Sequence, residues 1–408
     1  MPAIAVSAFS WTQAEIMPNL QSAAANENEY DKAAMELSNM HPTLSAERFV
    51  QSAWDLNSTT SNVQSLAHYM VHVNSEIHAA NRQERIHENL DQWSKLMALL
   101  RRRPNVSRGK LHRNLQDQGL GSLPDSALDL VIRVMFAIAT LPDSAIGGQL
   151  FRPRWKADES IVKLVSRVFP QRLPDDIPAL DTQRVKMQKM SLSYVTQYTH
   201  IEIQWTDYLS DHLLLSTGIN WKRLYVFRHP AFIRAALEHL ESKGVVADTQ
   251  ALSQGCLPPT LMKETLMTLH VLFPSADKRS RLLLEKEVKQ HGLDASLLEP
   301  LPPDHSYHET QRDALQPRSV SALYHKFPYW GERLYDLWIE AEDPTPITTV
   351  GNWSDSKKSG RYVYWAGFMA IVIAIIFGIA ATALAAVQVW ISWCAWVADP
   401  SRPSCSKS

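Results

Sequence analysis

Apolar residues recur at every third or fourth position through much of the chain, which is the spacing of one face of an α-helix. The clearest stripe follows a capping box formed by Ser61 and Gln64. Its apolar positions are Val63, Leu66, Met70, Val73 and Ile77, then Ile86, Leu90, Trp93, Met97 and Leu100. The polar stretch from Asn81 to Arg85 separates the two sets. The pattern therefore predicts either one long helix with a phase shift or two helices that meet there.

The same spacing predicts helices further along the chain. Their expected ranges are 125–139, 158–169, 230–240, 260–272, 275–290 with Gly292 as a stop signal, and 321–341. Only residues 200–205, which alternate apolar and polar, and the apolar run 224–227 indicate strands. A helix is expected to begin at Thr206, between them. The predicted fold is mainly α, with a possible small β element in the helical body.

One segment near the end of the sequence is apolar throughout. From Tyr364 to Val387 only Thr382 is clearly polar, and a helix of this length spans about 36 Å against a hydrocarbon layer of about 30 Å. Tyrosine and tryptophan mark both ends, as expected at headgroup depth. Representative span and interface residues are Tyr364, Trp365, Phe377, Gly378, Val387 and Trp390. A transmembrane helix is predicted over a buried core helix, because a core helix of this length without a charge is unusual.

The flanks of this segment suggest an orientation. Lys357, Lys358 and Arg361 precede the span, and Arg402 and Lys407 follow it. This small excess of basic residues, with no basic region in the first twenty residues to indicate a cleaved signal, favours a cytosolic body and a single-pass C-terminal anchor. Three glycosylation sequons would be modified only if the body were luminal: Asn57, Asn105 and Asn352.

The composition shifts along the chain predict a linear layout. The expected segments are a weakly patterned N-terminus (1–45), a helical body (46–298), a proline-rich linker (299–319), a helix (320–341), a spacer (342–360), the transmembrane segment with interfacial flanks (362–397) and a short tail (398–408).

The overall charge of the chain does not indicate a class of binding partner. Lysine and arginine number 41 against 42 acidic residues, a net charge of −1, so attraction to nucleic acid or anionic lipid must be local. The run from Arg101 to Arg113 could bind phosphates. Alternatively, Arg101 to Arg103 close a helix before Pro104 and complement its dipole. No aromatic residues interleave with the run, so nucleic acid is not expected as a partner.

Candidate catalytic residues cluster in one segment. It contains His200, Glu202, Asp207, Asp211 and His212. On the helix expected from Thr206, Asp207 and Asp211 share a face and could bind a metal or act as an acid–base pair. The alternative is that Asp207 complements the helix dipole beside a Thr206 cap, while Asp211 and His212 are surface or interhelical polar groups. Asp207, Asp211 and His212 are thus weak catalytic candidates.

Other chemistry has little support in the sequence. His68 and His72 have the spacing of a zinc helix but lack its glutamate, and the cluster from Asp304 to Glu309 lies in the predicted linker. Phosphate-binding glycine loops and a nucleophile elbow are missing. No cofactor and no metal are expected, and enzymatic activity is not favoured.

Several stretches, taken in order, resemble an uncharacterised family of filamentous-fungal proteins with a C-terminal transmembrane anchor. The matching residues are Trp205, Thr206, Asp207, His212, Leu213, Phe273, Pro274, Trp330, Arg333, Leu334, Ile376, Phe377, Gly378, Gln388 and Val389. The stretch "NWSDSKKSGR" departs from the family, which has a longer basic and aromatic run there. The resemblance implies a fungal origin and a membrane segment, and it carries no catalytic activity.

These observations favour a single-pass membrane-anchored interaction or accessory protein. Two alternatives stay open: an accessory enzyme or factor in a fungal specialised-metabolite pathway, and a binder of anionic lipid or nucleic acid through 101–113. The expected partners are the lipid bilayer and a protein, or a second copy, that pairs with the helices of 61–103.

Overall fold

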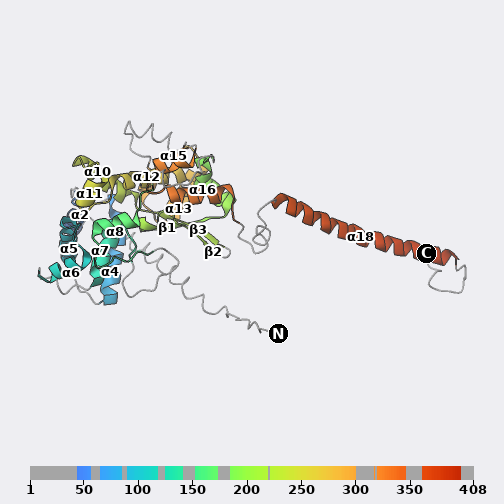
Figure 1. Cartoon of the computed structure of the whole chain (residues 1–408), viewed down its shortest axis with the longest axis horizontal. Helices are drawn as coiled ribbons and strands as arrows, with labels where there is room; N and C mark the ends of the chain where they lie inside the picture. Colours follow the sequence, from blue (N-terminus) through green and yellow to red (C-terminus); the bar gives the residue numbers. More distant parts are fainter. Residues whose placement is uncertain are drawn as a thin grey trace, which may run out of the picture. The chain divides into compact units, whose positions relative to one another are not determined.

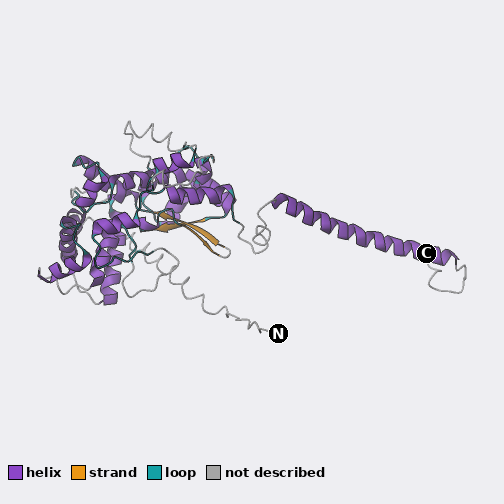
Figure 2. Ribbon diagram, in the orientation of Figure 1, coloured by secondary structure: helices purple, strands orange, loops and turns teal. Residues whose placement is uncertain are grey.

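The computed structural model describes residues 44–56, 65–84, 90–117, 125–140, 152–172, 184–218, 221–299, 317, 319–345 and 361–396. The chain divides into two compact units, Met1–Pro344 and Thr345–Ser408. The first unit is mainly helical and contains one small sheet, as the sequence predicts (Figures 1 and 2).

Helices before the sheet bury most of their apolar stripes. They are α2 (Leu44–Trp54), α4 (Ala67–Glu84), α5 (Leu90–Arg102), α6 (Arg108–Asp117), α7 (Asp125–Phe136) and α8 (Ile161–Val168). Met70, Val73 and Ile77 of α4 and Trp93 and Met97 of α5 are all buried, which confirms the predicted apolar face. The capping box at Ser61 lies outside the described residues.

The remaining elements of the first unit lead into and out of the sheet. Before it come η2 (Met187–Met190), α9 (Leu192–Tyr194) and η3 (Val195–Thr199), and within it η4 (Leu209–Asp211). After it come α10 (Pro230–Ser242), α11 (Asp248–Ser253), α12 (Pro259–Leu272), α13 (Lys278–His291), η5 (Ala295–Leu298), α15 (Val320–Lys326) and α16 (Gly331–Glu342). Gly292 caps α13 with φ of 55°, as its position in the sequence predicts.

The sheet has three strands in the order β1-β3-β2. They are β1 (Glu202–Thr206), β2 (Leu215–Gly218) and β3 (Trp221–Phe227). β3 is central: it pairs with β1 in parallel and with β2 in an antiparallel hairpin. Both predicted strands are present, whereas β2 was not expected.

The helix predicted over 321–341 is wrong, because two helices occupy this range. The break contains Pro328. Proline has no backbone N–H to donate and its ring clashes with the preceding turn, so it interrupts the hydrogen bonds of a helix. Oε2 of Glu264, from α12, accepts hydrogen bonds from the backbone nitrogens of Tyr329 (2.9 Å) and Trp330 (3.1 Å). This carboxyl group therefore satisfies donors at the start of α16.

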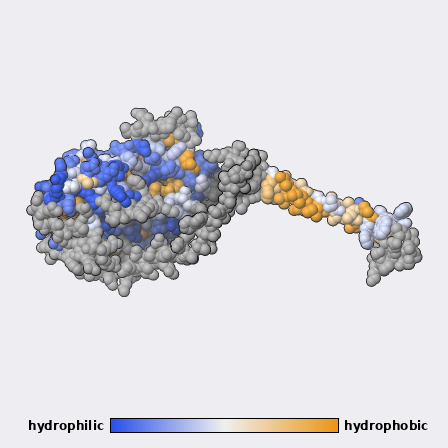
Figure 3. Space-filling model, turned by 60° about the horizontal axis from the view of Figure 1, so that its bottom comes forward, coloured by the Kyte–Doolittle hydropathy of each residue, from blue (hydrophilic) through white to orange (hydrophobic). Residues whose placement is uncertain are grey.

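The second unit contains α18 (Arg361–Trp396). Within Gly367–Trp396 the most apolar window has a mean hydropathy of 2.7, and no residue in that window is buried. Apolar side chains cover much of its surface (Figure 3), and Trp390 and Trp396 are exposed. The helix is long and apolar enough to cross a membrane. The side chains of Tyr364 and Trp365 lie outside the described part.

Candidate functional site

The carboxyl-terminal ends of β1 and β3 bring charged side chains together. Thr206 pairs with Phe227 at the end of this parallel pair, so the following residues leave the sheet at the same edge. These residues are Asp207, Tyr208, Arg228 and His229. Ligands often bind beyond the carboxyl ends of parallel strands, which makes this edge the first place to look for a site.

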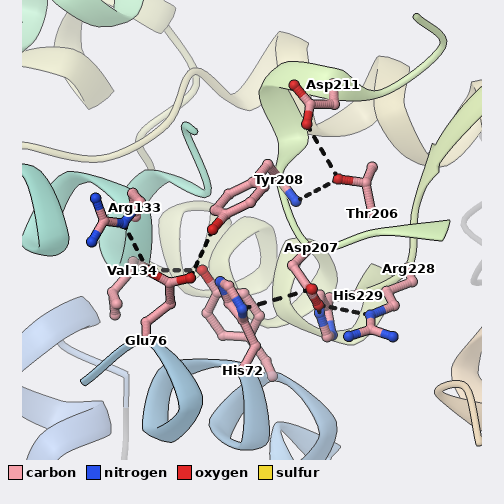
Figure 4. A network of polar contacts seen from close by, with 11 residues as sticks. His72, Glu76, Arg133, Val134, Thr206, Asp207, Tyr208, Asp211, Arg228 and His229 are labelled. Carbon is pink, nitrogen blue, oxygen red and sulfur yellow. Dashed lines mark hydrogen bonds and ion pairs between the residues drawn. The ribbon is translucent and has the colours of Figure 1, made fainter. Parts of the chain in front are cut away.

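Asp207 is the centre of this polar network (Figure 4). Its Oδ1 accepts hydrogen bonds from Nε of Arg228 and from Nε2 of His229, both at 2.7 Å. Nδ1 of His72, on α4, lies 3.9 Å from Oδ2. Burial raises the pKa of Asp207, but attraction to His72 and Arg228 and the hydrogen bond from His229 outweigh it, so the pKa lies well below its usual range. Asp207 is therefore an ionised carboxylate near neutral pH.

His229 is held in its neutral form. Burial lowers the pKa of His229 to about 4, and the hydrogen bond and charge of Asp207 offset this only in part. The rings of Tyr69 and Phe227 pack against it, with centroids 5.1 and 5.6 Å away. An aspartate–histidine pair activates a nucleophile when the other ring nitrogen faces a hydroxyl or thiol. Nδ1 of His229 has no hydrogen-bond partner among the described residues, so this pair has no nucleophile there.

Tyr208 extends the network to two helices. Its hydroxyl donates to Oε1 of Glu76 on α4, and Nε of Arg133 on α7 donates to Oε2, both at 2.7 Å. Burial, followed by the charge of Glu76, raises the pKa of Tyr208 well above its usual value. The phenol is thus a fixed donor that joins the sheet edge to α4 and α7 (Figure 4).

Asp211 is buried in a different environment. Its Oδ1 and Oδ2 lie 2.8 and 2.6 Å from Nη1 of Arg152. The predicted helix from Thr206 is wrong: Thr206 ends β1, and only the short turn η4 follows. Oγ1 of Thr206 accepts a hydrogen bond from the backbone nitrogen of Tyr208, as a helix cap does, but forms a local turn instead. Asp207 and Asp211 consequently do not share a helix face.

His212 is a satisfied core histidine. Its Nδ1 accepts from the backbone nitrogen of Phe227 at 3.2 Å, and Nε2 lies 2.7 Å from Oγ1 of Thr268. Thr268 donates its own hydroxyl hydrogen to the carbonyl of Thr265, so Nε2 of His212 is the donor. Burial, then the charge of Arg333, lowers the pKa of His212 to about 3. Both nitrogens of the neutral ring are therefore used in holding β3 against α12.

The basic run does not form one continuous charged surface. Arg101 pairs with Asp55 at 3.3 Å, and Arg102 and Arg103 are exposed at the end of α5, as predicted for a helix terminus. Arg108 is buried and pairs with Asp129 of α7 at 2.8 Å. One of the basic side chains is thus part of the core.

Other predicted residues are dispersed. His200 and Glu202 are exposed, while His72 is buried beside Asp207 and His68 is half-buried. The described residues contain no group of three side chains suited to a metal ion. The 304–309 cluster, Asn57 and Asn352 lie outside the described residues, whereas Asn105 is exposed in a turn after α5.

Sequence reasoning missed most members of the polar network around Asp207 and Tyr208. Glu76, Arg133, Arg228 and His229 carried no motif. The available signal was that Arg228 and His229 directly follow one apolar strand, just as Asp207 follows the other. Residues placed in this way meet only if the strands are parallel neighbours.

Comparisons with known proteins do not identify a family for this chain. No protein-family model matches the chain, and searches of curated proteins and of solved structures find no significant similarity. Asp207, Asp211 and His212 have separate protein partners, and their contacts join elements of the first unit.

Proposed function

We propose that the chain is a single-pass membrane-anchored accessory protein whose helical body acts by binding rather than by catalysis. The observation that carries the proposal is α18. Its large apolar side chains are exposed along the helix, including Ile376, Phe377 and Leu384. Water solvates such a surface poorly, whereas the hydrocarbon of a bilayer covers it.

The binding role is supported by the state of the candidate catalytic residues. Asp207 is ionised and paired with Arg228, Asp211 is paired with Arg152, and His212 uses both ring nitrogens inside the core. A general acid or base needs a pKa near the working pH and access to a substrate. These side chains instead join elements of the first unit.

The proposal places the body on the cytosolic side, which the basic residues before α18 favour. Asn105 provides the test, because its sequon is exposed on the body. We expect no mobility shift when the protein from a eukaryotic host is treated with an endoglycosidase. The matched control is the same chain behind a cleavable signal peptide, which should be modified and should lose the modification once Asn57, Asn105 and Asn352 are all changed to Gln. A shift in the native chain would place the body in the lumen.

Membrane anchoring has its own test. The native chain should stay with membranes during alkaline carbonate extraction, and a chain that ends at residue 360 should be released. Release of the native chain into the supernatant would contradict anchoring. The family resemblance given above would make the host cell that of a filamentous fungus.

A further inference from the structure

The outward side of α13, labelled in Figure 1, carries positive charge that no described side chain neutralises. The helix contains five lysine and arginine residues and two glutamates. Nε of Arg281 lies 3.1 Å from Oε1 of Glu285, and no other lysine or arginine of α13 has an ion pair with a described residue. The four cations without such a pair are all exposed, and together they are called the basic face: Lys278, Arg279, Lys286 and Lys289.

The basic face is confined to one side of the helix. At 3.6 residues per turn its four cations fall within an arc of about 100°. Leu282 lies near the middle of this arc and is 55 % exposed. The buried residues Ser280 and Leu284 lie on the opposite side of the helix. Neither glutamate of α13 falls inside the arc, so the basic face combines four cations with one exposed apolar side chain.

The stability of the helix does not account for all of this charge. The first turn is the positive end of the helix dipole, where cations are unfavourable. Lys278 and Arg279 nevertheless occupy the first two positions of α13, and this turn contains no acidic residue. Asp277 caps the helix by accepting hydrogen bonds from the backbone nitrogen of Arg279 and the hydroxyl of Ser280. The two side-chain charges are therefore left for another partner.

The combination of cations with an exposed leucine favours the surface of a bilayer as that partner. Anionic headgroups attract lysine and arginine, and the hydrocarbon just beneath them can bury an apolar side chain. The phosphates of a nucleic acid would pair with the cations but would leave Leu282 in water. Base stacking also needs aromatic side chains, and α13 contains no phenylalanine, tyrosine or tryptophan.

We propose that the basic face of α13 docks onto the surface of a bilayer that contains anionic phospholipid. Its four cations lie among the headgroups, and Leu282 reaches the boundary with the hydrocarbon. The inference rests on the proposed function for its setting, because an anchored body stays within reach of a bilayer. The basic face itself belongs to the first unit.

Binding to a second membrane tests docking separately from anchoring. The full chain is placed in nanodiscs of phosphatidylcholine and mixed with sucrose-loaded vesicles of equal parts phosphatidylcholine and phosphatidylserine, and the bound fraction is measured by sedimentation. We expect these vesicles to bind at least about tenfold more tightly than vesicles of phosphatidylcholine alone, and added salt to weaken the binding. Equal binding to both kinds of vesicle would overturn the inference.

Failure of the anchor would be seen differently. A chain that does not enter nanodiscs would contradict the proposed function, and its binding to the two kinds of vesicle is then measured without nanodiscs. A chain that enters nanodiscs but does not bind the anionic vesicles would contradict docking alone.

Paired variants test whether α13 makes the contact. Each lysine or arginine near an anionic surface strengthens binding about fivefold, so Lys278→Gln combined with Arg279→Gln should weaken vesicle binding about twentyfold. The unfolding temperature should stay the same or rise, because both charges oppose the helix dipole. Arg102→Gln combined with Arg103→Gln removes the same charge from exposed positions at the end of α5 and should alter binding by less than about twofold.

Leu282→Gln distinguishes a bilayer from other anionic partners. The variant keeps all four cations, and losing the burial of a half-exposed leucine should weaken vesicle binding about fivefold. Native vesicle affinity in this variant, or in the variant without Lys278 and Arg279, would refute the proposal. A duplex oligonucleotide that displaces the vesicles, and binds Leu282→Gln as tightly as the native chain, would make nucleic acid the partner instead.

Discussion

The rings of His72 and His229 stack with centroids 5.9 Å apart and planes inclined by 28°, although one belongs to α4 and the other directly precedes α10. Asp207 lies against a nitrogen of each ring. One carboxylate thus joins α4 to the edge of the sheet, and its charge is matched by Arg228.

Removing the charge of Asp207 should unfold the body more readily. Asp207→Asn keeps the size of the side chain but leaves the guanidinium of Arg228 without its anion. Breaking one partner of a buried pair costs about 3–5 kcal/mol, and we expect a loss near the lower end because Asp207 is 22 % exposed. Denaturant unfolding of the full chain in nanodiscs measures it. Asp158→Asn, at an exposed position, should change the free energy of unfolding by less than about 0.5 kcal/mol.

Stability should also fall on acidification. In the folded chain the pKa values of His212 and His229 are about 3 and about 4, below the ordinary 6.5. Below about pH 6.5 the unfolded chain binds a proton on each of these histidines and the folded chain does not. Each histidine therefore lowers the free energy of unfolding by about 1.4 kcal/mol for every pH unit of acidification. Asp207, with its lowered pKa, adds a further loss once the pH falls below 3.8.

Glu264 should make the stability depend on pH in the opposite direction. Burial, only partly offset by its two backbone hydrogen bonds, raises the pKa of Glu264 to about 8 from 4.5. The folded chain therefore keeps a proton that the unfolded chain has released, and this contribution decreases as the pH rises from about 4.5 to about 8. Together with the histidines, it predicts maximal stability near pH 6.5.

Glu264→Gln isolates this effect. The amide accepts the same backbone hydrogen bonds and has no proton to lose, so the decline of about 2 kcal/mol between pH 6.5 and 8 should disappear. Unfolding measured across this range in both proteins provides the comparison. An unchanged decline in the variant would show that another group causes it.

Substitutions in the basic run from Arg101 to Arg113 should have different effects at the surface and in the core. Arg102→Gln combined with Arg103→Gln changes exposed residues, so binding to vesicles that contain anionic lipid should differ from the native chain by less than about twofold. Arg108→Gln leaves Asp129 buried without its cation, and about 3–5 kcal/mol of stability should be lost. Co-sedimentation and denaturant unfolding measure the two effects. A large loss of vesicle binding in the double variant would restore the lipid-binding alternative.

A charge in the middle of α18 should impair insertion. An arginine at the centre of a transmembrane helix costs about 2.5–3.5 kcal/mol in insertion assays. Ile376→Arg should therefore reduce the fraction of chain that resists carbonate extraction, while Ile376→Leu should behave like the native protein. Full retention of the arginine variant would argue against a span centred there.

Local patterns predict most of the helices because the three- and four-residue spacing of buried positions is visible in the sequence itself. The exceptions have local causes. Pro328 ends α15 early within a pattern that otherwise continues, and β2 is a four-residue strand with Leu215 as its only large apolar residue. The turn at Thr206 makes a hydrogen bond that also begins helices, and the sequence does not distinguish the two outcomes.

The polar network was less predictable. Asp207 stood out among neighbouring ionisable residues, but the expected partner was Asp211, one helical turn away. Its actual partners are set by the parallel pairing of β1 with β3 and by the packing of α4, which places His72 there. Such contacts depend on tertiary structure, and no local spacing encodes them.

The central position of β3 has a consequence for the order of folding. β2 and β3 are close in sequence, so their hairpin closes a short loop, whereas β1 must return from further back to reach the free edge of β3. We expect the hairpin to form first and β1 to dock onto it afterwards, so that Asp207 meets Arg228 late. Substitutions in the Asp207 network should then mainly accelerate unfolding and leave the folding rate nearly unchanged.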